Sequence, residues 1–341
     1  MADQPRIHRI VPGAGIEGGR VFIEGEGLAG AGGEPPIVQV AGVPTRPLFA
    51  SGTRIIAPIP ADAVPGPVTL GEGDGLITGP QLSVGKRLAG DLNPVANPAV
   101  DAGGTIYTTL SGRRGQQVPV SLFTVTDEGG STPLPADIQN PTGLAFDRQG
   151  HLVVSSRAEG TVYRVLSGGG LEVVAQDLGV ATGIAFDPEG NLYVGDRSGP
   201  IHRVDAAGGI TRLAELSPSV AAFHLAWGPD ACLYVTAPSL SNDDPIYRIE
   251  PGGRVGIIAR GLARPQGLAF DAAGRLHVVA IRGTARGVLR LDGETFTWVV
   301  AAENLVGLAF DPTGGLVLAT TDAIFRVTPA PAPRPRSGPD A

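Results

Sequence analysis

The sequence has little cysteine, lysine or aromatic character. Of its 341 residues one is cysteine, Cys232, one is lysine, Lys86, and aromatic residues make up 5%. A single cysteine excludes an intrachain disulfide and every motif that needs several cysteines. No apolar run is long enough to span a membrane, and the first residues, MADQPRIHRIVPGAG, lack the apolar stretch of a signal peptide. We therefore predict a soluble protein with no membrane partner, which is cytoplasmic, or exported if a leader was removed from this sequence.

Positive charge is also scarce. The chain has 26 basic and 33 acidic residues, which gives a net charge of -7. A protein that binds the phosphate backbone of nucleic acids needs a basic field, so we expect no nucleic-acid partner. Glycine and proline are abundant, at 51 and 31 residues, but hydrophobic residues reach 42%. This balance predicts a folded chain that is rich in turns.

A repeat with a period near forty residues covers most of the chain. Its copies include ATGIAFDPEGNLYVGDR from 181 and PQGLAFDAAGRLHVVAIR from 265, which share a Phe-Asp-x-x-Gly core. Six copies align at Asp101, Asp147, Asp187, Gly228, Asp271 and Asp311, so the spacings are 46, 40, 41, 43 and 40 residues.

Each copy contains short apolar runs separated by glycine-rich turns. In the copy from 141 these runs are GLAF, LVVSS, TVYRVL and LEVVAQ. Four antiparallel strands per repeat predict one blade of a β-propeller. We interpret the Asp of the first turn as an Asx-turn acceptor and its Gly as a residue with positive φ, so the motif shapes the blade and does no chemistry.

The two ends of the repeat region complement each other. The last copy stops after its third run, IFRV near 324–327, whereas residues near 82–89 resemble an outer strand that precedes the first copy. We predict that residues near 82–89 strap onto the last blade and remove two unpaired edges. The predicted fold is all-β, with a small immunoglobulin-like β-sandwich over 1–81, a six-bladed β-propeller over 82–328 and a disordered proline-rich tail over 329–341.

Both predicted domains resemble known families. The segments PRIHRIVPGAGIEGGRVFIEGEGL, VQVAGVPT and GTRIIAPIPADAVPGPVTL resemble the IPT/TIG domain, which implies a spacer or docking module. The segment ATGIAFDPEGNLYVGDRSGPIHRV resembles the NHL repeat, and the propeller is more distantly similar to the gluconolactonase (regucalcin-like) family. The segment AWGPDACLYVT also resembles repeats of the streptogramin lyases.

The gluconolactonase resemblance implies a divalent metal at the channel mouth, held by Asn, Asp and Glu just before the glycine of each innermost strand. In this sequence the column has no carboxylate; it holds Ala96, Thr142, Thr182, Phe223, Gln266 and Val306. Hard cations need several oxygen ligands, normally including charged ones. We therefore expect no metal and no other cofactor. The GEGLAG at 25–30 is interpreted as a turn, because the AGGEPP that follows cannot start a helix.

His224 stands where four other copies have glycine. The equivalent residues are Asn97, Gly143, Gly183, Gly267 and Gly307. This position starts the innermost strand at the mouth of the channel, where a titratable ring can contact a ligand. The alternative is that His224 fills the gap left by an irregular blade. Both interpretations stay open.

Arginines recur in the loop after the second strand of several copies. They are Arg157, Arg197 and Arg282, with Arg113 and Arg114 in the longer first-blade loop. Their guanidinium groups suit carboxylates and phosphates, which predicts an anion site. Alternatively, they form a solvated rim of ion pairs with Asp196 and Asp322. The predicted ligand-binding residues are Thr142, Arg157, Thr182, Asp196, Arg197, His224, Gln266 and Arg282, with no catalytic and no metal-binding residue.

Two functions compete. The first is a non-catalytic binding or scaffold protein whose propeller channel face holds a small anion, a peptide or a protein. The second is an enzyme acting at the channel mouth, either a gluconolactonase-like hydrolase or a streptogramin-lyase-like enzyme, with His224 in its catalytic set. We favour the first because the usual hydrolase and nucleotide-binding signatures are absent.

Overall fold

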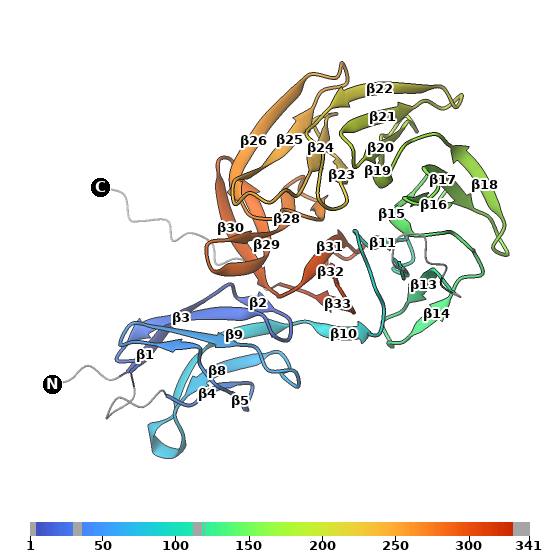
Figure 1. Ribbon diagram of the computed structural model, residues 1–341. Helices are drawn as coiled ribbons and strands as arrows, with labels where there is room; N and C mark the ends of the chain where they lie inside the picture. Colours follow the sequence, from blue (N-terminus) through green and yellow to red (C-terminus); the bar gives the residue numbers. More distant parts are fainter. Residues whose placement is uncertain (1–4, 30–35, 112–117, 119, 330–341) are drawn as a thin grey trace.

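The computed structural model describes residues 5–29, 36–111, 118 and 120–329 (Figure 1). Three features of the sequence analysis fall outside these residues: Arg113 and Arg114, the last glycine of GEGLAG, and the proline-rich tail beyond residue 329. Among the described residues no helix is long and apolar enough to cross a membrane.

The N-terminal part is built from short strands in two sheet regions that share one core. In strand β3 (Arg20–Glu26) the buried apolar residues alternate with exposed or half-buried ones, so that Val21 and Ile23 pack in one core with Ile55 and Val68. One sheet has the order β1 (Arg6–Val11), β3 (Arg20–Glu26), β7 (Arg54–Pro58) and β6 (Phe49–Ala50). The other region contains β2 (Ala14–Gly15), β9 (Ile77–Val84), β8 (Gly66–Leu70), β4 (Val38–Val40) and β5 (Val43–Thr45), with a 3-10 turn over Gly73–Gly75.

The repeat region folds into antiparallel sheets of four strands arranged around an axis (Figure 1). Each innermost strand contacts the innermost strand of the next sheet, and β31 contacts β11, so these strands form a closed ring. The sheets, from the innermost strand outward, are β11 (Ala99–Val100), β12 (Ile106–Thr109), β13 (Leu122–Val125) and β14 (Ser131–Pro133); β15 (Pro141–Phe146), β16 (Leu152–Ser156), β17 (Thr161–Val165) and β18 (Leu171–Ala175); β19 (Ala181–Phe186), β20 (Leu192–Asp196), β21 (Pro200–Val204) and β22 (Ile210–Glu215); β23 (His224–Trp227), β24 (Leu233–Thr236), β25 (Asp244–Ile249) and β26 (Val255–Leu262); β27 (Leu268–Phe270), β28 (Leu276–Arg282), β29 (Ala285–Asp292) and β30 (Thr295–Ala301); and β31 (Leu305–Phe310), β32 (Leu316–Thr320), β33 (Ile324–Val327) and β10 (Lys86–Ala89).

The last sheet takes its outer strand from the N-terminal side of the ring. Strand β10 pairs antiparallel with β33, with Lys86 opposite Arg326. The predicted strap is therefore present, but it is shorter than expected. Residues up to Val84 belong to β9, which pairs with β8 and β2, so β9 runs across the boundary that we predicted between residues 81 and 82.

A continuous sheet joins the N-terminal strands to the ring. Strand β2 pairs in parallel with β9 on one side and with β30 on the other, where Gly15 lies opposite Ala301. The Ile16 N–H donates to the Ala301 carbonyl at 3.0 Å. Ala301 is also part of the buried core of the N-terminal strands. The two parts thus share both backbone hydrogen bonds and apolar packing.

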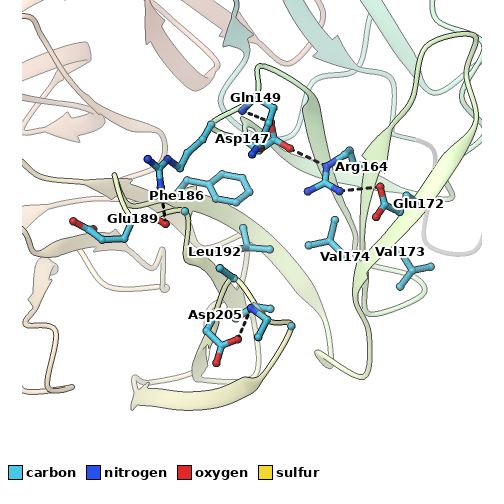
Figure 2. A pocket seen from close by; sticks show the side chains of 16 residues that line it. Asp147, Gln149, Arg164, Glu172, Val173, Val174, Phe186, Glu189, Leu192 and Asp205 are labelled. Atoms are coloured by element: carbon cyan, nitrogen blue, oxygen red, sulfur yellow. Dashed lines mark hydrogen bonds and ion pairs between the residues drawn. The ribbon is translucent and has the colours of Figure 1, made fainter.

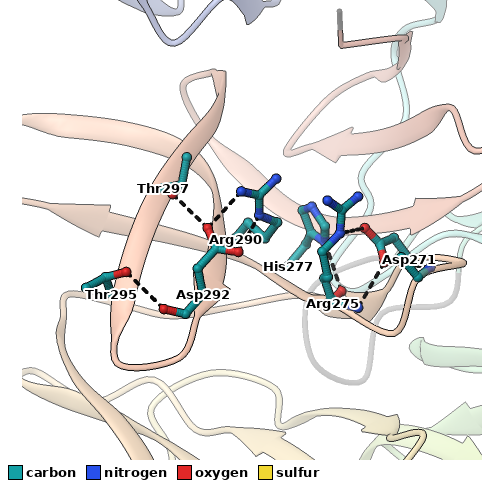
Figure 3. Close-up of polar contacts among 8 residues, drawn as sticks. Asp271, Arg275, His277, Arg290, Asp292, Thr295 and Thr297 are labelled. Atoms are coloured by element: carbon teal, nitrogen blue, oxygen red, sulfur yellow. Dashed lines mark hydrogen bonds and ion pairs between the residues drawn. The ribbon is translucent and has the colours of Figure 1, made fainter. Parts of the chain in front are cut away.

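The Asp of the repeat acts as an Asx-turn acceptor, as predicted. Asp147 Oδ1 accepts the N–H groups of Gln149 at 3.0 Å and His151 at 2.9 Å, and its Oδ2 accepts Arg164 Nε at 2.8 Å (Figure 2). Asp271 makes the same turn (Figure 3). The turn glycine takes positive φ, for example 81° at Gly150. These bonds satisfy backbone donors of the turn, which the strands do not pair.

The Asp carboxylates of these turns make the free energy of unfolding depend on pH. Burial raises the pKa of Asp147, but hydrogen bonds from the His151 backbone and the Arg164 side chain lower it more, so its pKa lies below the usual 3.8. The pKa values of Asp271 and Asp311 are lowered for similar reasons. A carboxyl whose pKa is depressed by folding stabilises the native state above its unfolded pKa. That contribution is lost as the pH falls from about 3.8 through the folded pKa.

We therefore expect urea unfolding to show a lower free energy of unfolding at pH 3 than at pH 6. Asp147→Asn should lower this free energy at pH 6 by about 1–3 kcal/mol, because it removes a buried charged acceptor, and should reduce the difference between the two pH values. The exposed Asp62 provides the control. An Asp147→Asn protein with the same pH dependence as the wild type and Asp62→Asn would contradict the prediction.

Candidate functional site

The inner strands approach one another most closely at the glycine column. A Cβ at Gly143, Gly183 or Gly307 would lie closer than 3.0 Å to backbone atoms of the next inner strand or of the segment that leads into it. Real Cβ atoms essentially never come so close. The ring therefore requires glycine at these positions.

Two members of the column carry side chains, Asn97 and His224. Asn97 Nδ2 donates to the Leu268 carbonyl at 3.0 Å, and its Oδ1 accepts the Leu308 N–H at 3.1 Å. The Asn97 amide thus links the inner strands of two other sheets.

A cavity of about 340 Å³ follows the inner strands from the level of Asn97 and His224. Because β23 begins at His224 and ends at Trp227, the cavity extends from the level of the glycine column to the far ends of the inner strands. Apart from Asn97 and His224 the side chains of the described lining residues are apolar, and polar atoms of the backbone also reach its surface. The lining residues are Ala96, Asn97, Pro98, Gly143, Leu144, Ala145, Gly183, Ile184, Ala185, His224, Leu225, Ala226, Trp227, Leu268, Ala269, Phe270, Leu308, Ala309 and Phe310.

His224 begins the inner strand β23, as predicted, but its side chain is buried and is not exposed at an open mouth. Its exposed fraction is 1%, and its Nε2 has no hydrogen-bond partner in the described part of the chain. Burial lowers the pKa of the ring to about 4. The imidazole is therefore neutral at neutral pH, with one nitrogen able to donate and the other able to accept. A buried polar atom without a partner costs about 1–3 kcal/mol.

The polar side chains just before the glycine column are engaged by the backbone. Thr142 Oγ1 donates to the Asn140 carbonyl. Thr182 Oγ1 donates to the Gly195 carbonyl at 2.9 Å and accepts the Phe223 N–H at 3.1 Å. Gln266 belongs to the same column, and its side chain is half-buried. Of the eight predicted ligand-binding residues, His224 is the one that lines the channel cavity.

These residues do not fit the divalent metal that the gluconolactonase resemblance implies. Three of the six column positions are apolar and buried, namely Ala96, Phe223 and Val306, and the threonine hydroxyls are engaged by the backbone. No group of three or more His, Cys, Asp or Glu residues that could hold a metal ion occurs among the described residues. A hard cation needs several oxygen ligands, which this column does not supply.

The predicted arginine positions lie at the His224 end of the sheets. Arg157 and Arg197 occupy equivalent places, since their N–H groups donate to the Asn140 and Val180 carbonyls. Arg282 is exposed, and its guanidinium carbon lies 5.3 Å from the centre of the Phe296 ring on an outer strand. Asp196 is a turn residue: Oδ1 accepts the Val180 and Ser198 N–H groups.

The aromatic residues at the far end of the cavity were missed by the sequence analysis. They are Trp227, Phe270 and Phe310, at the end of their inner strands. The sequence does mark these residues, because an aromatic residue recurs just before the first turn of the repeat.

A second cavity, of about 380 Å³, lies between two neighbouring sheets (Figure 2). Its charged groups bind one another, since Arg164 pairs with both Asp147 and Glu172 at 2.8 Å. Arg148 donates to the Glu189 carbonyl. We do not consider it the primary site, because these partners already satisfy its main charges.

Comparisons with known proteins show the fold. No family model matches the sequence, and no curated protein matches it. An auxiliary nutrient binding protein from Bacteroides ovatus has a TM-score of 0.56 at 15% identity, covering 96% of this chain and 99% of that one. A similar protein from Bacteroides thetaiotaomicron has a TM-score of 0.53 at 12% identity, covering 96% and 98%. A gluconolactonase from Xanthomonas campestris has a TM-score of 0.58 at 17% identity, covering 78% and 90%. The chain is an all-β protein with a β-propeller.

Proposed function

We propose that this chain is a non-catalytic binding protein, with a six-bladed propeller and an N-terminal IPT/TIG-like domain that positions it. The proposal rests on the hydrogen bonds and the charge of the side chains at the predicted site. Thr142 and Thr182 are engaged by the backbone, and the one ionisable group among the described residues of the cavity wall is a neutral histidine. Such a set supplies neither a metal nor an acid and base pair for hydrolysis.

The likeness to auxiliary nutrient binding proteins supports this proposal. It extends over 96% of this chain and thus includes the N-terminal strands, whereas the gluconolactonase likeness extends over 78%. A shared fold does not determine function, so the support comes from the combination with the site.

We further propose that the ligand is an anion, which includes the carboxylates and phosphates of a small molecule, a peptide or a protein. Arg157 and Arg197 lie at equivalent positions of neighbouring sheets, at the same end as His224. Guanidinium groups bind carboxylates and phosphates through paired hydrogen bonds.

The test measures binding of sugar acids, dicarboxylates, phosphates and acidic peptides by calorimetry. Replacing Arg157, Arg197 and Arg282 together with alanine should weaken binding of any ligand found by tenfold or more, since a charged hydrogen bond contributes about 1.5–3 kcal/mol. The matched control replaces Arg212, Arg254 and Arg260, which are exposed on or beside outer strands. Equal affinities for the wild type and the first triple variant would refute the anion site.

The second candidate is a lactonase-like or lyase-like enzyme, favoured by the position of His224 in the channel. Hydrolysis of a panel of aldonolactones, with and without calcium, zinc or manganese, distinguishes it. We expect no turnover above the uncatalysed rate. Metal-dependent turnover that His224→Ala abolishes would favour the enzyme instead.

A further inference from the structure

We propose that the proline- and arginine-rich end of the chain, residues 330–341, docks within the same molecule on an aromatic pocket at the far end of the propeller. The pocket has a volume of about 430 Å³. It is formed where three neighbouring inner strands, β19, β23 and β27, pass into their first turns, at the end opposite His224. The anion site proposed above lies at the His224 end, so the two proposals are independent.

The first step of the argument is the wall of this pocket. Trp227 and Phe270 supply half-buried aromatic rings, and Pro188 and Pro229 are exposed beside them. The Trp227 ring is held in place because it stacks on Tyr193, with ring centres 5.0 Å apart. Grooves lined by aromatic rings bind proline-rich segments, because a polyproline II chain is already extended and loses little entropy on docking.

The second step is a negative charge at the rim. Glu189 is exposed, and its carboxylate has no ion pair or hydrogen bond among the described residues. Its backbone carbonyl accepts Arg148, and in Figure 2 its side chain points away from Arg164. The other acidic residue of the pocket, Asp271, pairs with Arg275 at 2.7 Å. Glu189 is therefore the carboxylate that can bind a guanidinium group from another segment.

The third step is the sequence of the occupant. Proline alternates with alanine or arginine over residues 329–336, which read PAPAPRPR. Such a sequence favours the polyproline II conformation. Its two arginines, Arg334 and Arg336, carry the charge that complements Glu189. Prolines for the aromatic wall and arginines for its rim thus occur in one short segment.

The fourth step is the place where this segment starts. Val327 at the end of β33 pairs with Leu316, and Leu316 pairs with Phe310. The last strand therefore ends at the same end of the propeller as Phe310, which lines the channel cavity together with Trp227. The segment spans about 37 Å as a polyproline II helix. A domain of the propeller's size has a radius of gyration of about 18 Å, so the pocket is within reach.

The experiment follows the fluorescence of Trp227 in the full chain. The sequence has two tryptophans, so Trp298→Phe leaves Trp227 as the reporter. A docked segment shields the indole from acrylamide. Replacing Arg334 and Arg336 with glutamate should raise the quenching constant of Trp227 about twofold or more, because Glu189 then repels the segment. Where Trp298→Phe fails to fold, the ¹⁵N indole signals of the chain with both tryptophans replace it, and the Trp227 signal should shift.

An exchange of charges tests the contact with Glu189. Glu189→Lys alone should raise the quenching constant by a similar factor. Combined with Arg334→Glu and Arg336→Glu, it should restore the original value, because the attraction is restored with its signs reversed. Glu72→Lys is the matched control, because Glu72 is exposed on the N-terminal part. Circular dichroism establishes that each variant is folded.

The outcomes decide between occupants. An unchanged quenching constant after replacement of Arg334 and Arg336 overturns the proposal, as does a Glu189→Lys protein that behaves like Glu72→Lys. Shielding that is lost on dilution from about 100 to 1 µM would assign the pocket to a second copy and overturn docking within one molecule, which does not depend on concentration. Loss of the anion site would leave the quenching of Trp227 unchanged, so a failure of either proposal is recognised separately.

Discussion

Gly307→Ala is expected to lower the free energy of unfolding by about 3 kcal/mol or more. The added Cβ would lie closer than 3.0 Å to the Ala96 carbonyl oxygen and the Asn97 Cα. Both are backbone atoms of the segment that leads into the next inner strand, so they can retreat only if the ring opens. The shift would also disturb the hydrogen bond between Asn97 and the Leu308 N–H. Urea unfolding followed by circular dichroism measures the change.

The control for this prediction is Gly252→Ala. Nothing lies within 4 Å of a Cβ at Gly252, and its φ is not positive. We expect it to change the free energy of unfolding by no more than about 0.5 kcal/mol. If both variants lose similar stability, the close approach of the inner strands is not the reason that Gly307 is needed.

Gly19→Val is expected to separate unfolding of the N-terminal strands from unfolding of the propeller. A Cβ at Gly19 would lie closer than 3.0 Å to the carbonyl carbon and oxygen of Ala301, the residue that joins the two parts. Loss of this joint removes the shared hydrogen bonds and core packing. Calorimetry should then show two transitions where the wild type shows one.

Gly13→Val is the matched control, because it adds the same side chain in the same segment with nothing within 4 Å of its Cβ. We expect it to retain a single transition near the wild-type melting temperature. A Gly19→Val protein that still melts in one transition would show that the joint is not needed for cooperative unfolding.

Much of the propeller could be predicted because its repeat is local. The period places each sheet, and the Phe-Asp-x-x-Gly core places each first turn, so the observed Asx turns follow directly. The pairing of β2 with β30 could not be predicted. Strand β2 has only two residues, Ala14–Gly15, and its partner is far away in the sequence, so no periodic pattern marks the contact.

The site was predicted only in part. His224 stood out because it breaks a column of glycines, and it does line the cavity. Its burial depends on how closely the inner strands converge, which a sequence does not express. The arginine positions also followed from the repeat, but the contact of Arg282 with Phe296 comes from packing between strands of one sheet.

The pairing of β10 with β33 has a consequence for how the protein is made. A chain synthesised from its N-terminus exposes β10 long before its partner, since Lys86 pairs with Arg326, 240 residues later. Until then the edge of β10 has no backbone partner within the ring. Two complete chains that have not yet closed their rings can, at high concentration, pair the β10 of one with the β33 of the other, so the strand that closes one ring instead joins two molecules by domain swapping.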